Sequence, residues 1–371
     1  MPDPSLRSRR QPPALIRGYC VLGLLFWGGV GCWTAPAKTE TILPIVQTYQ
    51  TQIKDLNPMN QPLLFDAASE FAEGLAAVRM GDRIGYIDPS GDLVVTVSDP
   101  NVSISSAYAE DLAIARAGDY YGYLDRSGDW AIQVQFKQAK GFVDGLAAVQ
   151  GGTKYGFINP QGEWVIEPQF DLAGSFSGGL AVVKLDNRYG YIDRNGRRTI
   201  APTFQDAWGF SEQLAVVKIG DRYGYIDPAG NTAIAPGFDG AFSFSEGLAR
   251  VRLGGEWGYI TADGSFAIAP QYGFASDFSE GLAVVLIDGQ WGYVDAQGTV
   301  AIAPQYEYAS DFSEGFAVVK VDGRYGFINT AGNIAIAPQF SNCGSFSEGW
   351  ARVQMGTQWT YINTSGELMS H

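Results

Sequence analysis

The sequence predicts an all-β protein, built as a tandem array of nine 34-residue units that are each a three-stranded antiparallel sheet. One phrase recurs, in its fullest form Phe-Ser-Glu-Gly-Leu-Ala-Val-Val from Phe278. The step between copies is 37 residues once, at the start, and 34 residues at all later steps. Runs of Val, Ile and Tyr bounded by Gly, Asp or Asn follow each phrase and predict strands. The copies begin at Phe71, Tyr108, Phe142, Phe176, Phe210, Phe244, Phe278, Phe312 and Phe346.

Residues 1–37 are expected to be a signal peptide. A basic stretch precedes the apolar run Tyr19–Val30, and small residues at Ala35 and Ala37 suit cleavage before Lys38. Two alternatives stay open, an uncleaved membrane anchor over residues 18–33 and a lipoprotein modified at Cys32. The first is short for a membrane span. These residues indicate an exported protein of the periplasm, cell envelope or extracellular space.

Residues 38–61 are a polar lead-in, and residues 62–371 are the repeat array. The spacing of Ile45, Tyr49, Ile53 and Leu56 allows a short helix over 42–56. The text near Phe65 resembles the end of a unit, because Phe65 lies six residues before Phe71 as Phe170 lies six before Phe176. The array therefore opens with a partial unit, and it closes with another after Gly366.

Within the unit that begins at Phe176, strands are expected at 180–185, 188–193 and 198–201. The gaps between them are short enough only for hairpins, so neighbouring strands must be antiparallel. Pro202 has no N–H to donate, so it should end the third strand or lie at a sheet edge. The small residue three positions after the next aromatic is Ala in most copies and Cys343 in the last, which predicts a buried small residue there and not a nucleophile.

Glycine occupies the second hairpin turn in every copy, which predicts a left-handed backbone conformation. An Asp, Asn or Thr three residues earlier can accept a backbone N–H and fix the turn. A row of calcium-binding carboxylates is the rejected alternative, because Asn and Thr replace Asp in several copies. The turn residues singled out are Gly196, Gly230, Gly264, Gly298, Gly332, Asp193, Asp227 and Asp295.

Paired aromatics lie two residues apart in the second strand, hence on one face of the sheet. We expect them to form a packed aromatic spine between units, and the glycine between them to leave room for another backbone. A platform for sugar rings or a peptide is the alternative function. Its candidate residues are Trp257, Tyr259, Trp291, Tyr293, Trp359 and Tyr361.

The Phe-Ser-Glu-Gly phrase joins successive units. Its Ser and Glu are suited to hydrogen-bond the turn, whereas a row of Glu side chains from successive copies is expected to be a solvated face. Gly178 interrupts that row in one copy.

Both an open solenoid and a closed, propeller-like ring fit the repeat. The partial units at the two ends suit closure by strand exchange. Against a ring, propellers usually have four strands a blade and four to eight blades, whereas three strands and nine units are counted here. The constant step suits one rotation applied repeatedly, so the open superhelical array is the preferred prediction.

Charge and composition restrict function. The net charge of −14 opposes binding to nucleic acid or anionic lipid, so the membrane is expected to be met only through an uncleaved N-terminal segment. The only histidine is His371, which removes most catalytic and zinc constellations. The clearest departures from the repeat are Gly178, Gln213, Thr261 and Thr360, and none introduces an acid, base or strong nucleophile. No enzymatic activity, cofactor or metal is expected.

The repeat text resembles the WG repeat, also called the KWG repeat, of many bacterial proteins. The matching residues are Gly289–Asp295 and Ala303–Tyr306, with the phrase from Phe312 and their copies over about 62–366. The tryptophan that gives the repeat its name is present only at Trp257, Trp291 and Trp359, and Thr360 replaces the following glycine in the last copy. The resemblance implies a β repeat, commonly in exported or envelope proteins, without a general activity. We therefore expect a non-enzymatic scaffold that binds a protein or ligand outside the cytoplasm, with a cell-wall polysaccharide or peptidoglycan binder as the alternative.

Overall fold

A computed structural model describes residues 61–370 of the protein. The expected signal peptide and the lead-in up to residue 60 lie outside these residues. The described part contains β-strands and no α-helix. It forms nine antiparallel sheets, which we number as blades 1 to 9 along the chain.

The blades are made of the following strands, each sheet being hydrogen-bonded in chain order. Blade 1 contains β1 (Ala67–Ala68), β2 (Ala76–Met80), β3 (Arg83–Ile87) and β4 (Leu93–Val97); blade 2 contains β5 (Val102–Ala109), β6 (Leu112–Ala117), β7 (Tyr120–Leu124) and β8 (Trp130–Phe136); blade 3 contains β9 (Ala147–Gly151), β10 (Lys154–Ile158) and β11 (Trp164–Phe170). Blade 4 contains β12 (Leu172–Ser177), β13 (Leu180–Leu185), β14 (Arg188–Asp193) and β15 (Arg198–Phe204); blade 5 contains β16 (Asp206–Ala207), β17 (Ala215–Ile219), β18 (Arg222–Ile226) and β19 (Thr232–Phe238); blade 6 contains β20 (Gly240–Ala241), β21 (Leu248–Leu253), β22 (Glu256–Thr261) and β23 (Phe266–Tyr272). Blade 7 contains β24 (Phe274–Ala275), β25 (Leu282–Ile287), β26 (Gln290–Asp295) and β27 (Val300–Tyr306); blade 8 contains β28 (Tyr308–Ala309), β29 (Phe316–Val321), β30 (Arg324–Asn329) and β31 (Ile334–Phe340); blade 9 contains β32 (Asn342–Ser347), β33 (Trp350–Met355) and β34 (Gln358–Asn363).

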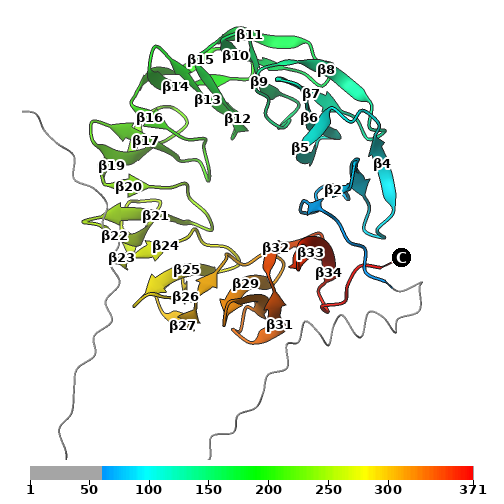
Figure 1. Cartoon of the computed structure of the whole chain (residues 1–371). Helices are drawn as coiled ribbons and strands as arrows, with labels where there is room; N and C mark the ends of the chain where they lie inside the picture. Colours follow the sequence, from blue (N-terminus) through cyan, green and yellow to red (C-terminus); the bar gives the residue numbers. More distant parts are fainter. Residues whose placement is uncertain (1–60, 371) are drawn as a thin grey trace, which may run out of the picture. The chain divides into compact units, whose positions relative to one another are not determined.

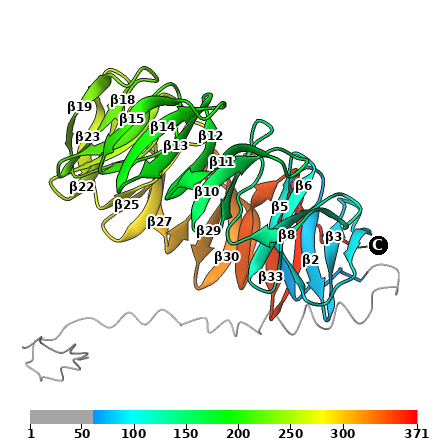
Figure 2. The same cartoon turned by 90° about the horizontal axis from the view of Figure 1, so that it is seen from above.

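The nine blades form a closed ring, a nine-bladed β-propeller (Figure 1). The first strand of each sheet lies toward the centre and the last strand lies on the outside, as the labels β5 and β8 show (Figure 1). Blades 1 and 9, the two ends of the array, lie side by side in both views (Figures 1 and 2). The preference for an open solenoid was therefore wrong, and the closed ring given as its alternative is correct.

The prediction of three strands per unit was also incomplete. Strands β13 and β14 have the expected bounds, and β15 continues through Pro202 to Phe204. Pro202 lies in the outermost strand of its blade, where no further strand needs its missing N–H. Eight of the nine sheets add an inner strand, all except blade 3, and in five of these sheets it has only two residues. Two residues such as Asp206 and Ala207 have no alternation from which a strand can be predicted.

The glycine between the paired aromatics permits close approach of the outer strand. A Cβ atom at Gly190 would lie 2.6 Å from the carbonyl oxygen of Ile200 and 2.7 Å from the nitrogen of Pro202. The pairing of β14 with β15 shifts register at this point. The expectation that this glycine makes room for another backbone is therefore confirmed, and the neighbour is the outer strand of its own blade.

Successive blades pack through one repeated aromatic contact. The ring of Tyr191 in blade 4 lies 5.0 Å from that of Phe210, which begins the next copy of the phrase. The Tyr191 hydroxyl donates a hydrogen bond to the carbonyl oxygen of Trp208 (2.8 Å), so its burial leaves no unpaired polar group. The same contact occurs at later interfaces, for example between Tyr225 and Phe244 at 5.1 Å. These rings are a packed spine between blades.

The two ends of the array close the ring inside blade 9. The N–H of Phe65 donates to the carbonyl oxygen of Trp359 (2.8 Å), and the N–H of Trp359 donates back to Phe65 (2.7 Å). The N–H of Leu63 donates to Met369 (3.0 Å), and that of Met369 donates to Tyr361 (2.8 Å). The outer strand of blade 9 is thus a composite of the start and the end of the array.

Candidate functional site

The two aromatics of each second strand differ in accessibility. Tyr259, Tyr293 and Tyr361 have no exposed surface, and burial raises the pKa of each hydroxyl. Their hydroxyls donate hydrogen bonds to carbonyl oxygens of the following blade. Tyr259, for example, donates to the carbonyl oxygen of Ser276 (2.7 Å). A ligand in solvent cannot reach these three residues while the blades are packed.

The first aromatic of each pair is half-buried at the edge of the same interface. The ring of Trp257 lies 5.6 Å from that of Phe242, and the guanidinium of Arg250 lies 5.6 Å from the Trp257 ring centre. Trp359 lies 4.9 Å from the guanidinium of Arg352 in the same way. Of the six aromatics proposed as a ligand platform, only Trp257, Trp291 and Trp359 present some surface to solvent.

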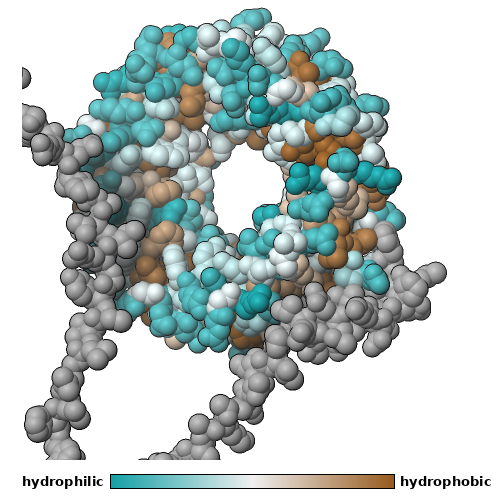
Figure 3. All heavy atoms as spheres, viewed as in Figure 1, coloured by the Kyte–Doolittle hydropathy of each residue, from teal (hydrophilic) through white to brown (hydrophobic). Residues whose placement is uncertain are grey.

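In blades 7 and 8, the half-buried aromatic of the second hairpin strand contacts further rings, so that four rings form a continuous run. Trp291 lies 5.0 Å from Phe274 and 6.3 Å from Tyr308, and Tyr308 lies 6.0 Å from Tyr325. Phe274 and Tyr308 belong to the inner strands β24 and β28, and they are 37% and 42% exposed. The inner strands line an open channel at the centre of the ring (Figure 3). We call Phe274, Trp291, Tyr308 and Tyr325 the aromatic run.

Two carboxylates on the inner segments lie near the aromatic run. Asp277 forms an ion pair with Nε of Arg250 at 2.8 Å. A terminal nitrogen of the same guanidinium donates a hydrogen bond to the carbonyl oxygen of Ala275 (2.8 Å). Desolvation raises the pKa of Asp277, Arg250 opposes that rise, and the nearby Asp311 adds to it. Blade 7 has Val284 where blade 6 has Arg250, so Asp311 has no equivalent arginine. The site therefore combines exposed rings with negative charge, which suits apolar or cationic groups of a partner.

The Phe-Ser-Glu-Gly phrase links each blade to the next. The hydroxyl of Ser245 donates to the carbonyl oxygen of Phe278 (2.8 Å), and the carboxylate of Glu246 accepts the N–H groups of Glu280 (2.7 Å) and Gly281 (2.8 Å). Seven of the nine interfaces in residues 61–370 have such a glutamate contact; those that follow Asp144 and Gly178 do not. The row of glutamates is thus engaged in contacts between blades, and is not a free acidic face.

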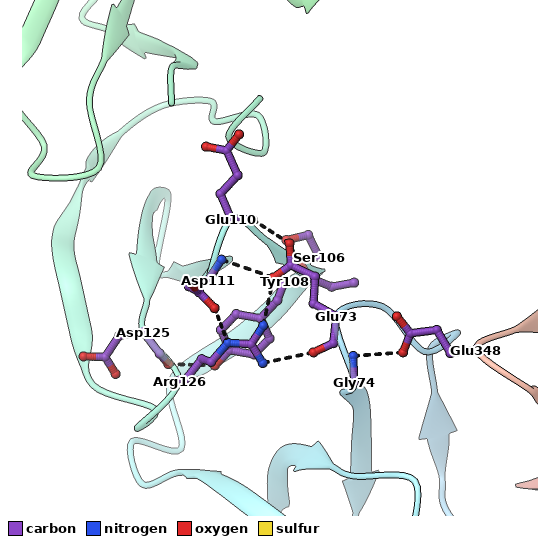
Figure 4. Close-up of polar contacts among 10 residues, drawn as sticks. Glu73, Gly74, Ser106, Tyr108, Glu110, Asp111, Asp125, Arg126 and Glu348 are labelled. Atoms are coloured by element: carbon purple, nitrogen blue, oxygen red, sulfur yellow. Dashed lines mark hydrogen bonds and ion pairs between the residues drawn. The ribbon is translucent and has the colours of Figure 1, made fainter. Parts of the chain in front are cut away.

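Arg126 strengthens this linkage between blades 1 and 2 (Figure 4). Its guanidinium is paired with Asp111 and donates to the carboxylate of Glu73 at 2.9 Å. The plane of the Tyr108 ring lies below, with its centre 5.2 Å from the guanidinium. On the other side of Glu73, Glu348 of blade 9 accepts the N–H of Gly74 at 2.8 Å. Each of these groups contacts at least one other, so they form a structural network.

The predicted turn residues lie between the third and fourth strands of their blades. The five glycines have φ between 77° and 86°. The carboxylate of Asp193 accepts the N–H groups of Asn195 and Arg197, both at 2.9 Å, and Asp295 accepts those of Gln297 (3.0 Å) and Thr299 (2.8 Å). Asp227 accepts the N–H of Asn231 at 2.8 Å. Each carboxylate is directed at its own turn, so these residues do not converge on a common ion.

A family model, described as WG containing repeat, matches residues 62–83, 121–152, 155–189, 189–223, 223–257, 257–291, 291–325 and 325–356. These segments make up more than half of the chain. The protein belongs to the WG-repeat family. The tryptophan and glycine for which the repeat is named, such as Trp291 and Gly292, are thus the half-buried edge aromatic and the residue that admits the outer strand.

Two solved structures are similar to this WG-repeat propeller, and the first of them supports the fold. A eukaryotic initiation factor aligns with a TM-score of 0.58 at 12% identity, over 80% of this chain and 95% of that chain. The C-terminal WD40 domain of Sif2 aligns with a TM-score of 0.43 at 10% identity, over 83% of this chain and 99% of that chain. No curated protein sequence matches this one. At such identities the likeness concerns the fold alone.

Within residues 61–370, the WG-repeat propeller contains no group of three His, Cys, Asp or Glu side chains arranged to hold a metal. Cys343 packs beside the core cluster between blades 8 and 9, and burial raises the pKa of its thiol, so little thiolate forms. The helix length and apolarity that a membrane span requires are not found in the described part of the chain.

Sequence reasoning did not find Phe274 and Tyr308. They occupy a position that differs in almost every copy, with Ala67, Leu172 and Asp206 among its equivalents. A repeat keeps the residues that its fold needs, so a variable position on an inner strand is free to serve binding. The variability of this position among the copies was therefore the sequence signal that could have indicated a binding surface.

Proposed function

We propose that this WG-repeat propeller is a non-enzymatic scaffold that binds a protein partner outside the cytoplasm through the channel wall of blades 7 and 8. The observation that supports it is the aromatic run, in which two rings are more than a third exposed and join through Trp291 across a blade boundary. Exposed aromatic clusters are frequent anchors of protein interfaces. The exposed carboxylate of Asp311, which has no equivalent arginine, favours a partner segment with apolar and basic side chains.

Site-specific crosslinking tests the proposal. A photo-reactive phenylalanine analogue replaces Tyr308 in one variant and Leu172 in a control, because Leu172 occupies the equivalent position of blade 4 and is 38% exposed. Crosslinking in the native host should give a discrete adduct from position 308 and none from position 172. Equal adducts from both positions, or none from either, would overturn the assignment of the site.

Cell-wall polysaccharide or peptidoglycan is the second candidate, since exposed rings also stack on sugars. Retention on isolated cell wall that falls in Phe274→Ala and Tyr308→Ala, and not in Leu172→Ala, would favour it over a protein partner. Tyr259, Tyr293 and Tyr361 are poor choices for such variants because they are structural.

Export is part of the proposal and has its own measurement. The basic and apolar stretch before Lys38 supports it. The intact mass of the protein from its native host should begin at Lys38, in the soluble fraction outside the cytoplasm. A full-length or lipid-modified chain in the membrane fraction would instead indicate an anchored scaffold.

A further inference from the structure

The interface between blades 1 and 2 differs from the others in its packing. It contains a cavity of about 810 Å³, lined on the blade 1 side by Ala67, Ala77, Arg79 and Ile84 and on the blade 2 side by Val102 and Ser103. Here the buried residues form two small clusters, whereas the interface between blades 4 and 5 has a single larger one. This is also where the repeat step is 37 residues instead of 34.

Three substitutions relative to blades 7 and 8 explain the cavity. Ala67 pairs with Arg79 as Phe274 pairs with Leu286, so Ala67 occupies the position of Phe274. Ile84 occupies the position of Trp291, because both stand on the third strand directly before the recurring glycine of the unit. Ser103 pairs with Arg116 as Tyr308 pairs with Lys320. Three aromatic rings are thus replaced by two small side chains and one aliphatic one, and the space they would fill is left open.

Arg79 is a cation whose aromatic partner is missing. In four other blades the residue at this position lies over the first aromatic of the same hairpin. The distances from the charged atom to the ring centre are 5.8 Å for Arg116 on Tyr121, 5.2 Å for Lys184 on Tyr189, 5.2 Å for Lys218 on Tyr223 and 5.3 Å for Lys320 on Tyr325. In blade 1 the cross-strand partner of Arg79 is Ile84, which has no ring.

Arg79 also lacks a carboxylate partner. Within residues 61–370 it takes part in no ion pair, and the acidic residue that lines the cavity, Asp82, belongs to the turn that follows its strand. The pairing of Arg79 with Ala67 and Ile84, both cavity residues, places it on the strand face that forms the wall. A flat ring held against this wall would meet the guanidinium as the tyrosine rings do in other blades.

We propose that the cavity between blades 1 and 2 binds a small aromatic anion. The ring takes the place that an aromatic side chain fills in the other blades, and its carboxylate, sulfonate or phosphate pairs with Arg79. The volume lies within the range of about 300 to 1,000 Å³ that is usual for small-molecule sites. The apolar walls give affinity for the ring, and Arg79 gives preference for negative charge. The site is separate from the aromatic run of blades 7 and 8.

The test uses three naphthalene probes of similar size, namely 1-naphthalenesulfonate, 1-naphthol and 1-naphthylmethylammonium, titrated calorimetrically into the wild-type protein. We expect one site that prefers the sulfonate. Arg79→Gln should weaken sulfonate binding about tenfold or more, through loss of a charge-assisted hydrogen bond. Asp82→Asn should strengthen it by removing a repulsive charge.

Ile84→Trp supplies the missing ring from the protein itself, and it should abolish binding of all three probes. Trp is present at this position in three other copies, so the variant should fold and melt at or above the wild-type temperature. Tyr223→Trp is the control, since it introduces Trp at the equivalent position of another blade, away from the cavity, and it should leave probe binding unchanged. Absence of any probe binding to wild type, or full affinity in Ile84→Trp, would overturn the site. Preference for the ammonium probe, weakened by Asp82→Asn, would overturn the assignment of an anion.

Discussion

The hydroxyl of Tyr361 donates a hydrogen bond of 2.7 Å to the carbonyl oxygen of Ser69, a residue 292 positions earlier in the chain. Tyr225 makes the equivalent bond to Phe242, only 17 positions later, at 2.8 Å. The Tyr361 ring also lies 5.0 Å from Phe71, as that of Tyr225 lies 5.1 Å from Phe244. The interface between the last and first blades is therefore built like an interface between consecutive blades, which is what a closed ring requires.

Tyr361→Phe and Tyr225→Phe should destabilise the protein by a similar amount. Each removes one buried hydroxyl and leaves a carbonyl oxygen without its donor, which costs about 1 kcal/mol. Chemical denaturation of both variants beside wild type measures the loss. If only Tyr225→Phe is destabilising, the interface between blades 9 and 1 is not formed in solution.

A closed ring was the alternative prediction from the sequence, and particular residues explain why it was not preferred. Phe65 stands in register with Phe170, which showed that the array begins with part of an outer strand. The usual count of blades argued against a ring, and the two-residue inner strands could not be recognised without their neighbours. The hairpins could be predicted well, because their strands alternate and their turns need glycine.

Thr360 was noted as a departure from the repeat, and the closed ring explains it. At the equivalent Gly258, a Cβ atom would lie 2.5 Å from the carbonyl oxygen of Ile268 in the outer strand. Blade 9 has no continuous outer strand, so a larger residue fits there. Thr360 is fully buried, and its Oγ1 has no hydrogen-bond partner among residues 61–370.

Thr360→Val should therefore stabilise the protein by about 1 kcal/mol, since it keeps the shape and removes an unsatisfied hydroxyl. Thermal melting measures the gain. Thr199→Val serves as control, because the Thr199 hydroxyl donates to the carbonyl oxygen of Tyr191 at 3.2 Å and its loss should not stabilise. A lower melting temperature for Thr360→Val would show that this hydroxyl has a partner after all.

Gln213 has φ of 67° at a turn position where the next copy has Gly247, with φ of 81°. A side chain in this left-handed conformation costs about 1 kcal/mol relative to glycine. Gln213→Gly should raise the free energy of unfolding by about that amount, and Gly247→Gln should lower it. Both are measured by denaturant titration. An unchanged stability in both variants would mean that the turn relaxes freely.

The buried tyrosines predict a loss of stability in alkali. Burial raises the pKa of Tyr191, Tyr225 and Tyr293 above the ordinary value of about 10, so the folded state favours the neutral hydroxyl. This contribution is fully present below pH ~10 and is lost as the pH rises further, because unfolded tyrosines then ionise and folded ones do not.

Tyrosinate absorbance and circular dichroism, followed together, test this. Exposed tyrosines should ionise first, and the spine tyrosines should ionise only as the β signal disappears. Ionisation of every tyrosine with an ordinary midpoint, while the sheets remain intact, would contradict the packed spine.

The binding surfaces could be predicted only in part. Trp291 belongs to the repeat and was named as a candidate, but Phe274 and Tyr308 acquire significance only from the blade beside them, and Arg79 only from the cavity that its blade forms with the next. The cavity between blades 1 and 2 depends on three residues on three different strands, Ala67, Ile84 and Ser103. Ile84 and the first repeat step of 37 residues both depart visibly from the repeat in the sequence. That they leave a cavity could be recognised only once the blades were placed side by side in the ring.

Closure of the ring is tested most directly by a disulfide between its two ends. Pro62 and Ser370 are bridge partners in the outer strand of blade 9, and antiparallel partners lie about 4.5 to 5.5 Å apart at Cα, which a disulfide spans. Pro62→Cys with Ser370→Cys is made in a background with Cys20, Cys32 and Cys343 changed to Ala, and Pro62→Cys with Ser127→Cys is the control. A closed ring predicts that mild oxidation of the folded monomer removes both thiols of the first pair and leaves those of the control free. Two free thiols in the first pair, after oxidation of the folded protein, would contradict the closed nine-bladed ring.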